Sequence, residues 1–270
     1  MVRLLYRALY ALLADFFSKN YTYHASAITF SAFLVLNAVV VFLGTVLKYV
    51  PGKEEVVARI YELFPEASAK VVDFLVRSVE NLTVQTQVLT LLLVVFFLGN
   101  FLRTVEYAFA FVSGGEPRKI PLVNYFLPFI FGLLLLLYGV VDFAIGLLPE
   151  VLKRFHLYHP LVEPVLETIR WAVNYLAFPL GLLVIYRTLS PVPLRPSTTL
   201  GVSLLLMLLL NPLKGLFTWY ATNFLVKNLV ITPFAGILMF LVWLYVLALA
   251  LLLGYRLILL LDGLKERRAA

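Results

Sequence analysis

Eight polar or charged side chains interrupt long apolar stretches of this sequence, where an ionisable group is costly and marks a candidate functional site. The first set is Asn100, Arg103 and Glu106. Their i, i+3, i+6 spacing predicts that they follow one stripe of a helix. Arg103 can pair with Glu106 and lock the packing of helices, or it can face a polar cavity and bind an anionic group. The spacing leaves both interpretations open.

The second set lies in later apolar stretches and contains Asp142, Arg170, Asn174, Asn211 and Lys214. Arg170 and Asn174 are four residues apart and share a helix face. Lys214 lies deep within its stretch, just after Asn211-Pro212, where a proline frees backbone carbonyls. An Asp142 paired with Arg170 or Lys214 would neutralise the site in the absence of a ligand. The alternatives are a structural ion pair or a lysine that snorkels to the membrane surface.

The elements that hold these side chains are predicted to be membrane-spanning helices. Of the 270 residues, 62% are hydrophobic and 14% are charged, against about 25% charged in an ordinary soluble domain. A bilayer accepts this much apolar surface because it solvates outward-facing apolar side chains. We therefore expect an all-α, polytopic membrane protein that forms one membrane domain over residues 1–270.

Six spans are predicted from the apolar stretches, at about 26–49, 87–112, 122–148, 165–189, 199–225 and 233–261. Residues 1–19 are predicted to form an amphipathic helix at the membrane interface, and residues 52–86 a helical hairpin outside the cytoplasm. Pro128, Pro179 and Pro212 fall inside spans, so local breaks are expected there, the sharpest at Asn211-Pro212.

The distribution of lysine and arginine predicts the orientation. With the N-terminus in the cytoplasm, the inner side holds eleven of these residues and the outer side seven. Positive charge concentrates on the cytoplasmic side of membrane proteins. We therefore expect a multi-pass protein of the cell (inner) membrane with both termini in the cytoplasm.

Several classes of site are disfavoured by composition. The chain has no cysteine, which excludes disulfides, thiolate metal sites and a cysteine nucleophile. His156 and His159 lie among acidic residues, but their spacing favours a solvated loop over a metal site. The net charge of +7 is spread over loops and span ends, so it predicts membrane topology and no nucleic-acid partner. No cofactor is expected.

Three groups of residues resemble a known family. They are Ala25 to Ala32 at the entry to the first span, Tyr186-Arg187 with Pro191, Arg195 and Gly201, and Tyr220, Phe224, Trp243-Leu244-Tyr245 and Leu253-Gly254. In these motifs the chain resembles the YihY/BrkB family of bacterial inner-membrane proteins along most of its length. The resemblance implies an envelope protein, since members are linked to serum resistance and to lipid or lipopolysaccharide traffic. An older ribonuclease BN label of the family is regarded as a misassignment.

Three hypotheses for the function follow. The first is a carrier or flippase for a lipid or another amphipathic anion, with membrane lipids as its partners. The second is a non-catalytic scaffold that organises envelope partners, for which the intramembrane charges would be dispensable. The third, a membrane-embedded hydrolase, has the least support because the sequence lacks the H-E-x-x-H and G-x-S-x-G motifs and an acidic metal cluster. No enzymatic activity is expected, and no sequence feature sets the oligomeric state.

Overall fold

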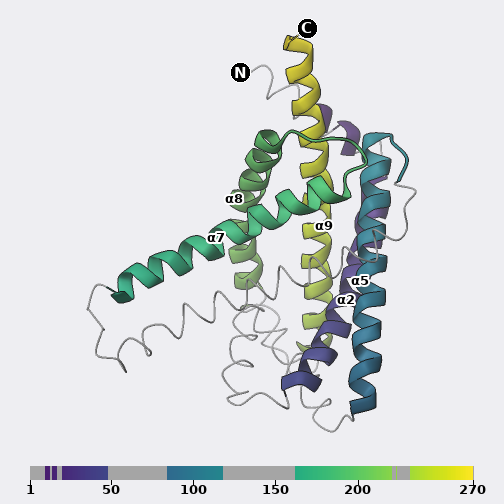
Figure 1. The fold of residues 1–270 in the computed structure, drawn as a ribbon, viewed down its shortest axis with the longest axis vertical. Coiled ribbons are helices and arrows are strands. Elements are labelled where there is room, and N and C mark those ends of the chain that lie inside the picture. The colour runs from purple at the N-terminus through teal and green to yellow at the C-terminus, as the bar shows by residue number, and fades with distance from the viewer. Residues whose placement is uncertain are drawn as a thin grey trace.

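A computed structural model describes residues 10–12, 14–16, 20–47, 84–117, 162–220, 223 and 232–269. This part of the chain is helical and contains no strand. Its long helices are α2 (Tyr21–Leu47), α5 (Val84–Ser113), α7 (Val162–Leu189), α8 (Pro196–Tyr220) and α9 (Thr232–Ala269) (Figure 1). The all-helical prediction is confirmed for these residues.

Four of the five helices are long and apolar enough to cross a membrane, namely α2, α5, α8 and α9. Helix α7 covers the predicted span at 165–189, but its continuous apolar stretch is shorter, from Tyr175 to Leu189. The predicted span at 122–148 lies outside the described residues, as do most of the interfacial helix at 1–19 and of the hairpin at 52–86. These three elements stay predictions.

The expected helix breaks at prolines are wrong where the structure describes them. Helix α7 continues through Pro179 and helix α8 continues through Pro212. A proline removes one backbone hydrogen bond and collides with the preceding turn, which bends or breaks an isolated helix. In an apolar surrounding, the flanking turns keep their own hydrogen bonds because no water competes for them. Pro128 lies outside the described residues.

Helices α2 and α5 pack side by side and antiparallel, and α9 lies against both (Figure 1). Near the start of α2, the ring of His24 lies 4.3 Å from that of Phe111, near the end of α5. About two helical turns further on, the hydroxyls of Ser31 and Thr104 are 3.3 Å apart. Small side chains such as Ala25 and Ala108, both fully buried, let the helices approach closely.

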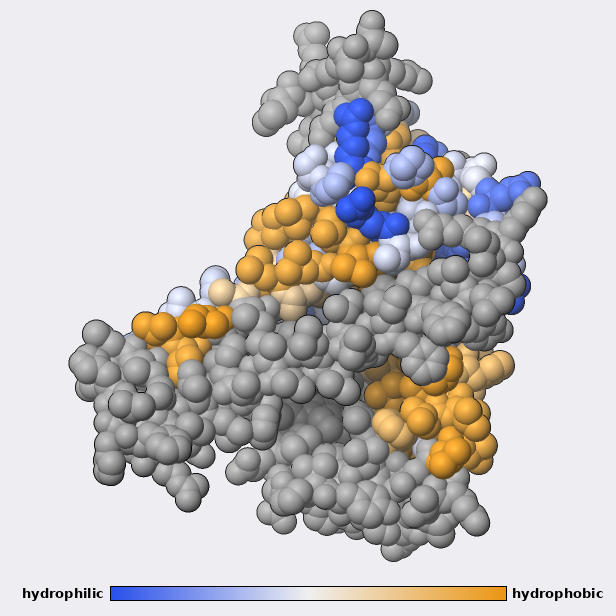
Figure 2. Space-filling model, in the orientation of Figure 1, coloured by the Kyte–Doolittle hydropathy of each residue, from blue (hydrophilic) through white to orange (hydrophobic). Residues whose placement is uncertain are grey.

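One end of the bundle carries four charged side chains from three segments of the chain, and we call it the charged end: Asp15, Arg195, Arg256 and Asp262. The Arg256 Nε donates to the Asp15 carboxylate at 2.6 Å, and the Arg195 backbone N–H donates to Asp262 at 3.1 Å. The second contact places a carboxylate at the first turn of α8, where the helix dipole stabilises negative charge. Figure 2 shows hydrophilic side chains gathered at this end, with apolar ones on the helix surfaces beyond it.

Removing Asp15 is expected to lower the free energy of unfolding by about 1–3 kcal/mol, because Arg256 would lose a charge-assisted partner in a partly buried site. The two side chains are only 20% and 22% exposed. Thermal unfolding in detergent of Asp15→Ala, Arg256→Ala and the double variant measures this coupling. If the losses of the two single variants simply add in the double variant, the ion pair contributes nothing.

At Gly254, α9 lies close to side chains of both α7 and α8. A Cβ added there would collide with the Tyr186 hydroxyl and would lie 2.5 Å from a methyl group of Leu206. Only a glycine allows this approach, which joins three helices at one point. The same three helices form the walls of the candidate site.

Gly254→Ala is therefore expected to destabilise the fold by about 1–3 kcal/mol through overpacking. Gly201→Ala is the matched control, since Gly201 also lies within a helix and its added Cβ would meet nothing within 4 Å. That variant is expected to be neutral or more stable by about 0.5–1 kcal/mol, because alanine favours helix. Equal melting temperatures for the two variants would contradict the close approach at Gly254.

Candidate functional site

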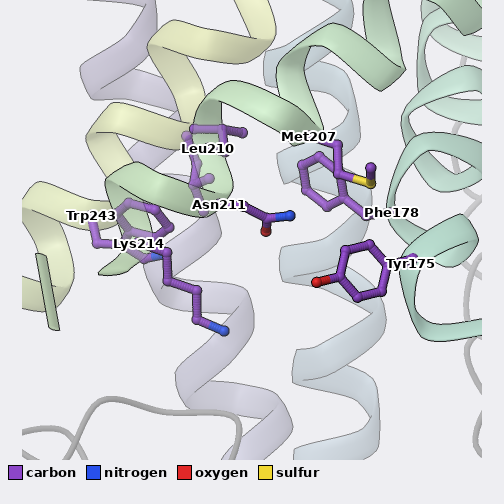
Figure 3. Close-up of a pocket in the computed structure, with 8 residues that line it drawn as sticks. Tyr175, Phe178, Met207, Leu210, Asn211, Lys214 and Trp243 are labelled. Carbon is purple, nitrogen blue, oxygen red and sulfur yellow. The ribbon is translucent and has the colours of Figure 1, made fainter. Parts of the chain in front are cut away.

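A cavity of about 420 Å³ opens between α7, α8 and α9 on the side of the bundle remote from the charged end (Figure 3). Its size lies within the range of about 300–1,000 Å³ that is typical of small-molecule sites. The lining residues come from all three helices and are Tyr175, Phe178, Met207, Leu210, Asn211, Lys214, Trp243 and Leu247.

The cavity exists because α7 crosses the bundle obliquely. Figure 1 shows that α7 meets the other helices near the charged end and leans away from them toward its N-terminus. The gap that this inclination leaves beside α8 and α9 is lined by the first half of the apolar stretch of α7. On the opposite wall, the ring of Phe217 packs against Trp243 at 5.3 Å and holds α8 to α9.

The polar groups of the cavity are an ammonium, an amide and a phenol. The side chains of Lys214 and Asn211 lie one helical turn apart on α8, and the Tyr175 hydroxyl faces them from α7 (Figure 3). Among the described residues, the Lys214 ammonium has no acidic partner. It lies about 27 Å along α8 from Pro196 and about 9 Å from Tyr220, at 1.5 Å per residue, and so within a helix that is long and apolar enough to cross a membrane.

The remaining lining is apolar or aromatic and runs along the same wall toward the charged end. Met207 lies one helical turn from Asn211, and Leu210 lies one turn from Lys214, both toward the charged end, with Phe178 opposite on α7. A lysine binds anions as a compact point charge, and the amide and the phenol can each donate a hydrogen bond. This arrangement suits a ligand with an anionic head and an apolar tail.

The structure brings together two of the five side chains of the second predicted set, Asn211 and Lys214. Arg170 and Asn174 belong to α7, as expected, but their side chains lie outside the described part of the structure. Asp142 also lies outside the described residues. The predicted neutralisation of Lys214 or Arg170 by Asp142 therefore stays a prediction.

The first set does not occupy one stripe of α5, which corrects the expectation from spacing. Asn100 and Arg103 are exposed, whereas Glu106 is 2% exposed and faces the core. The reason is geometric, since three residues advance a helix by about 300° and a second step of three moves Glu106 well away from Asn100. Arg103 instead lies against Tyr107, whose hydroxyl accepts from its guanidinium at 3.2 Å. None of the three lines the cavity.

Other residues of the site were not predicted from the sequence. Tyr175 and Phe178 are uncharged aromatic residues of a predicted span, and Trp243 stands out in the sequence only as part of a family-like motif. Their positions in the sequence could have indicated them as site residues, because Tyr175 directly follows Asn174 and Trp243 belongs to a family-like motif. Which aromatic side chains face α8 depends on the tilt of α7.

Comparisons with known proteins agree with a membrane protein of this type. A search of curated proteins and a search of solved structures each find no significant match. The family model described as virulence factor BrkB matches residues 12–269, which is nearly the whole chain. With its apolar spans and this match, the chain is an integral membrane protein that belongs to the BrkB virulence factor family.

Proposed function

We propose that this protein is a carrier that binds a lipid or another amphipathic anion in the cavity between α7, α8 and α9 and moves it across the membrane. The observation that supports the proposal best is the Lys214 ammonium, which lies inside a span beside an apolar wall and has no acidic partner among the described residues. A cation at that depth is costly unless an anion neutralises it. A lipid with an anionic headgroup supplies the charge and fills the apolar part.

The cavity also has the access that a lipid needs. Many large apolar side chains of α7 and α8 are exposed, among them Leu176, Leu208 and Leu216, and they face the acyl chains in a bilayer. A lipid can therefore enter sideways from the membrane without passing through water. The protein's own role is to bind and release, with no catalytic step.

The proposal includes a topology with six spans and with both termini in the cytoplasm. Helices α5 and α7 both end at the charged end, so an odd number of crossings must separate them, and the predicted span at 122–148 supplies one. The charged end carries Arg195 and Arg256, and Arg187 lies in the last turn of α7 near it, which favours the cytoplasm of a cell inner membrane. The Lys214 cavity then opens in the outer half of the membrane.

The test is lipid movement in vesicles. The purified full chain is reconstituted in phosphatidylcholine vesicles that contain fluorescent phosphatidylglycerol, and the loss of inner-leaflet probe to an external quencher is followed. The protein should speed the movement of phosphatidylglycerol above that in protein-free vesicles and above that of fluorescent phosphatidylcholine. Equal rates with and without protein would overturn the carrier and favour the scaffold.

A further inference from the structure

The cavity is closed on the side of the charged end by the same three helices that form its walls. Next to Met207 and Leu210, in the direction of the charged end, Leu206 of α8 lies against Gly254 of α9. Gly254 in turn lies against the Tyr186 hydroxyl of α7. Tyr186 follows the cavity residue Phe178 by about two helical turns. We call the contact of Tyr186, Leu206 and Gly254 the constriction.

Few specific bonds hold the constriction together. The Tyr186 hydroxyl donates to the backbone carbonyl of Leu251 on α9 at 2.9 Å, and the hydroxyls of Ser190 and Tyr255 are 2.8 Å apart. The rings of Phe109, Tyr186 and Tyr255 pack against one another, with centroids 5.7 Å apart for Phe109 and Tyr186, 4.2 Å for Phe109 and Tyr255, and 6.2 Å for Tyr186 and Tyr255. These aromatic side chains are fully buried, so the constriction is dry. A dry aromatic seal blocks the passage of a charged headgroup.

One polar side chain at this level is fully buried. Ser203 lies on the buried stripe of α8, one turn from Leu206 toward the charged end, and its side chain is 0% exposed. Its hydroxyl finds no hydrogen-bond partner among the described residues. A buried unsatisfied hydroxyl destabilises a fold, so alanine would serve better if packing were its only role. A passing headgroup would be hydrogen-bonded by it.

We infer that the constriction is the inner gate of the carrier and that the structure is a state open toward the outer half of the membrane. The Tyr186 hydroxyl is the latch, because it joins α7 to α9 by one side chain and can be released by a small rotation of α7. Opening then connects the cavity with the charged end past Ser203. This inference rests on the carrier proposed above. It identifies the opening of the constriction as the step that lets a ligand pass between the Lys214 site and the charged end.

The absence of cysteine from the chain allows a direct test with a single introduced thiol. Ser203→Cys reports on opening, because the thiol is buried while the constriction is closed. Ser31→Cys is the control, since Ser31 is also a buried serine but lies on α2 and bonds to Thr104, away from the constriction. Each variant is made in the wild-type chain and with Tyr186→Phe, which removes the latch hydroxyl and keeps the stacked ring.

Labelling by a membrane-impermeant maleimide is measured in inside-out membrane vesicles. Tyr186→Phe is expected to raise the labelling rate at Ser203→Cys about three- to tenfold, which corresponds to one lost hydrogen bond, and to leave that at Ser31→Cys unchanged. Unchanged labelling at Ser203→Cys would overturn the gate, and so would an equal rise at both positions, which indicates general loosening.

The lipid assay separates this inference from the function it rests on. If the wild-type protein moves phosphatidylglycerol while Ser203→Cys labelling does not respond to Tyr186→Phe, the carrier stands and the gate is wrong. If the wild-type protein moves no lipid, the carrier is wrong, and the constriction is then no gate even when its labelling responds.

Discussion

Replacing Lys214 with alanine is expected to reduce the rate of phosphatidylglycerol movement by roughly 10- to 100-fold, which is the effect of losing one charge-assisted contact to the headgroup. The fold should survive, because the Lys214 side chain is exposed to the cavity and has no acidic partner among the described residues. Fluorescent-lipid movement in vesicles and the melting temperature in detergent measure the two quantities. A lost rate with an unchanged melting temperature is the expected pair of results.

Two further variants test whether the effect depends on the charge at that site. Lys214→Arg keeps a cation in the cavity and should retain most of the rate, although guanidinium geometry differs from that of an ammonium. Arg187→Ala removes an exposed cation of α7 outside the cavity and should leave the rate unchanged. If Lys214→Ala leaves the rate of lipid movement as unchanged as Arg187→Ala does, the carrier does not bind its lipid at Lys214. The charge at Lys214 would then be dispensable, as the scaffold hypothesis requires.

Replacing Glu106 with alanine is expected to cost about 3–5 kcal/mol of unfolding free energy, the largest stability loss predicted for this chain. Glu106 is 2% exposed, lies on the buried face of α5 and interacts with its surroundings. Removing one member of a buried charged or hydrogen-bonded group leaves the other members unsatisfied in an apolar environment. Thermal or denaturant unfolding of the purified variant measures the loss.

Arg103→Ala is the matched comparison on the same helix. Arg103 is exposed and lies with its guanidinium carbon 5.5 Å from the centre of the Tyr107 ring. An exposed cation of this kind contributes about 0.5–1 kcal/mol. A loss for Arg103→Ala as large as that for Glu106→Ala would show that the two side chains act as one ion pair. The double variant would then recover part of the stability, as expected from their spacing in the sequence.

The sequence determined the class of the protein and the positions of its helices. Helix α7 ends at Leu189, where the predicted span ends, and α2 and α8 differ from their predicted spans by a few residues at each end. These features are local, because hydrophobicity along about 20 residues decides whether a segment enters a bilayer. The pairing of Asn211 with Lys214 in one site was also predictable, since residues three apart share a helix face.

Only the tertiary structure decided which helices meet. The Asp15–Arg256 ion pair joins residues 241 positions apart in the sequence, and neither residue has a local pattern that selects the other. The tilt of α7 determines that Tyr175 faces Lys214 across a cavity. Gly254 was visible in the sequence as part of a family-like motif, but its use as the contact point for Tyr186 and Leu206 follows from three helices converging there. Apolar periodicity predicts that a helix has a buried face, whereas the partner of that face depends on the packing of the whole bundle.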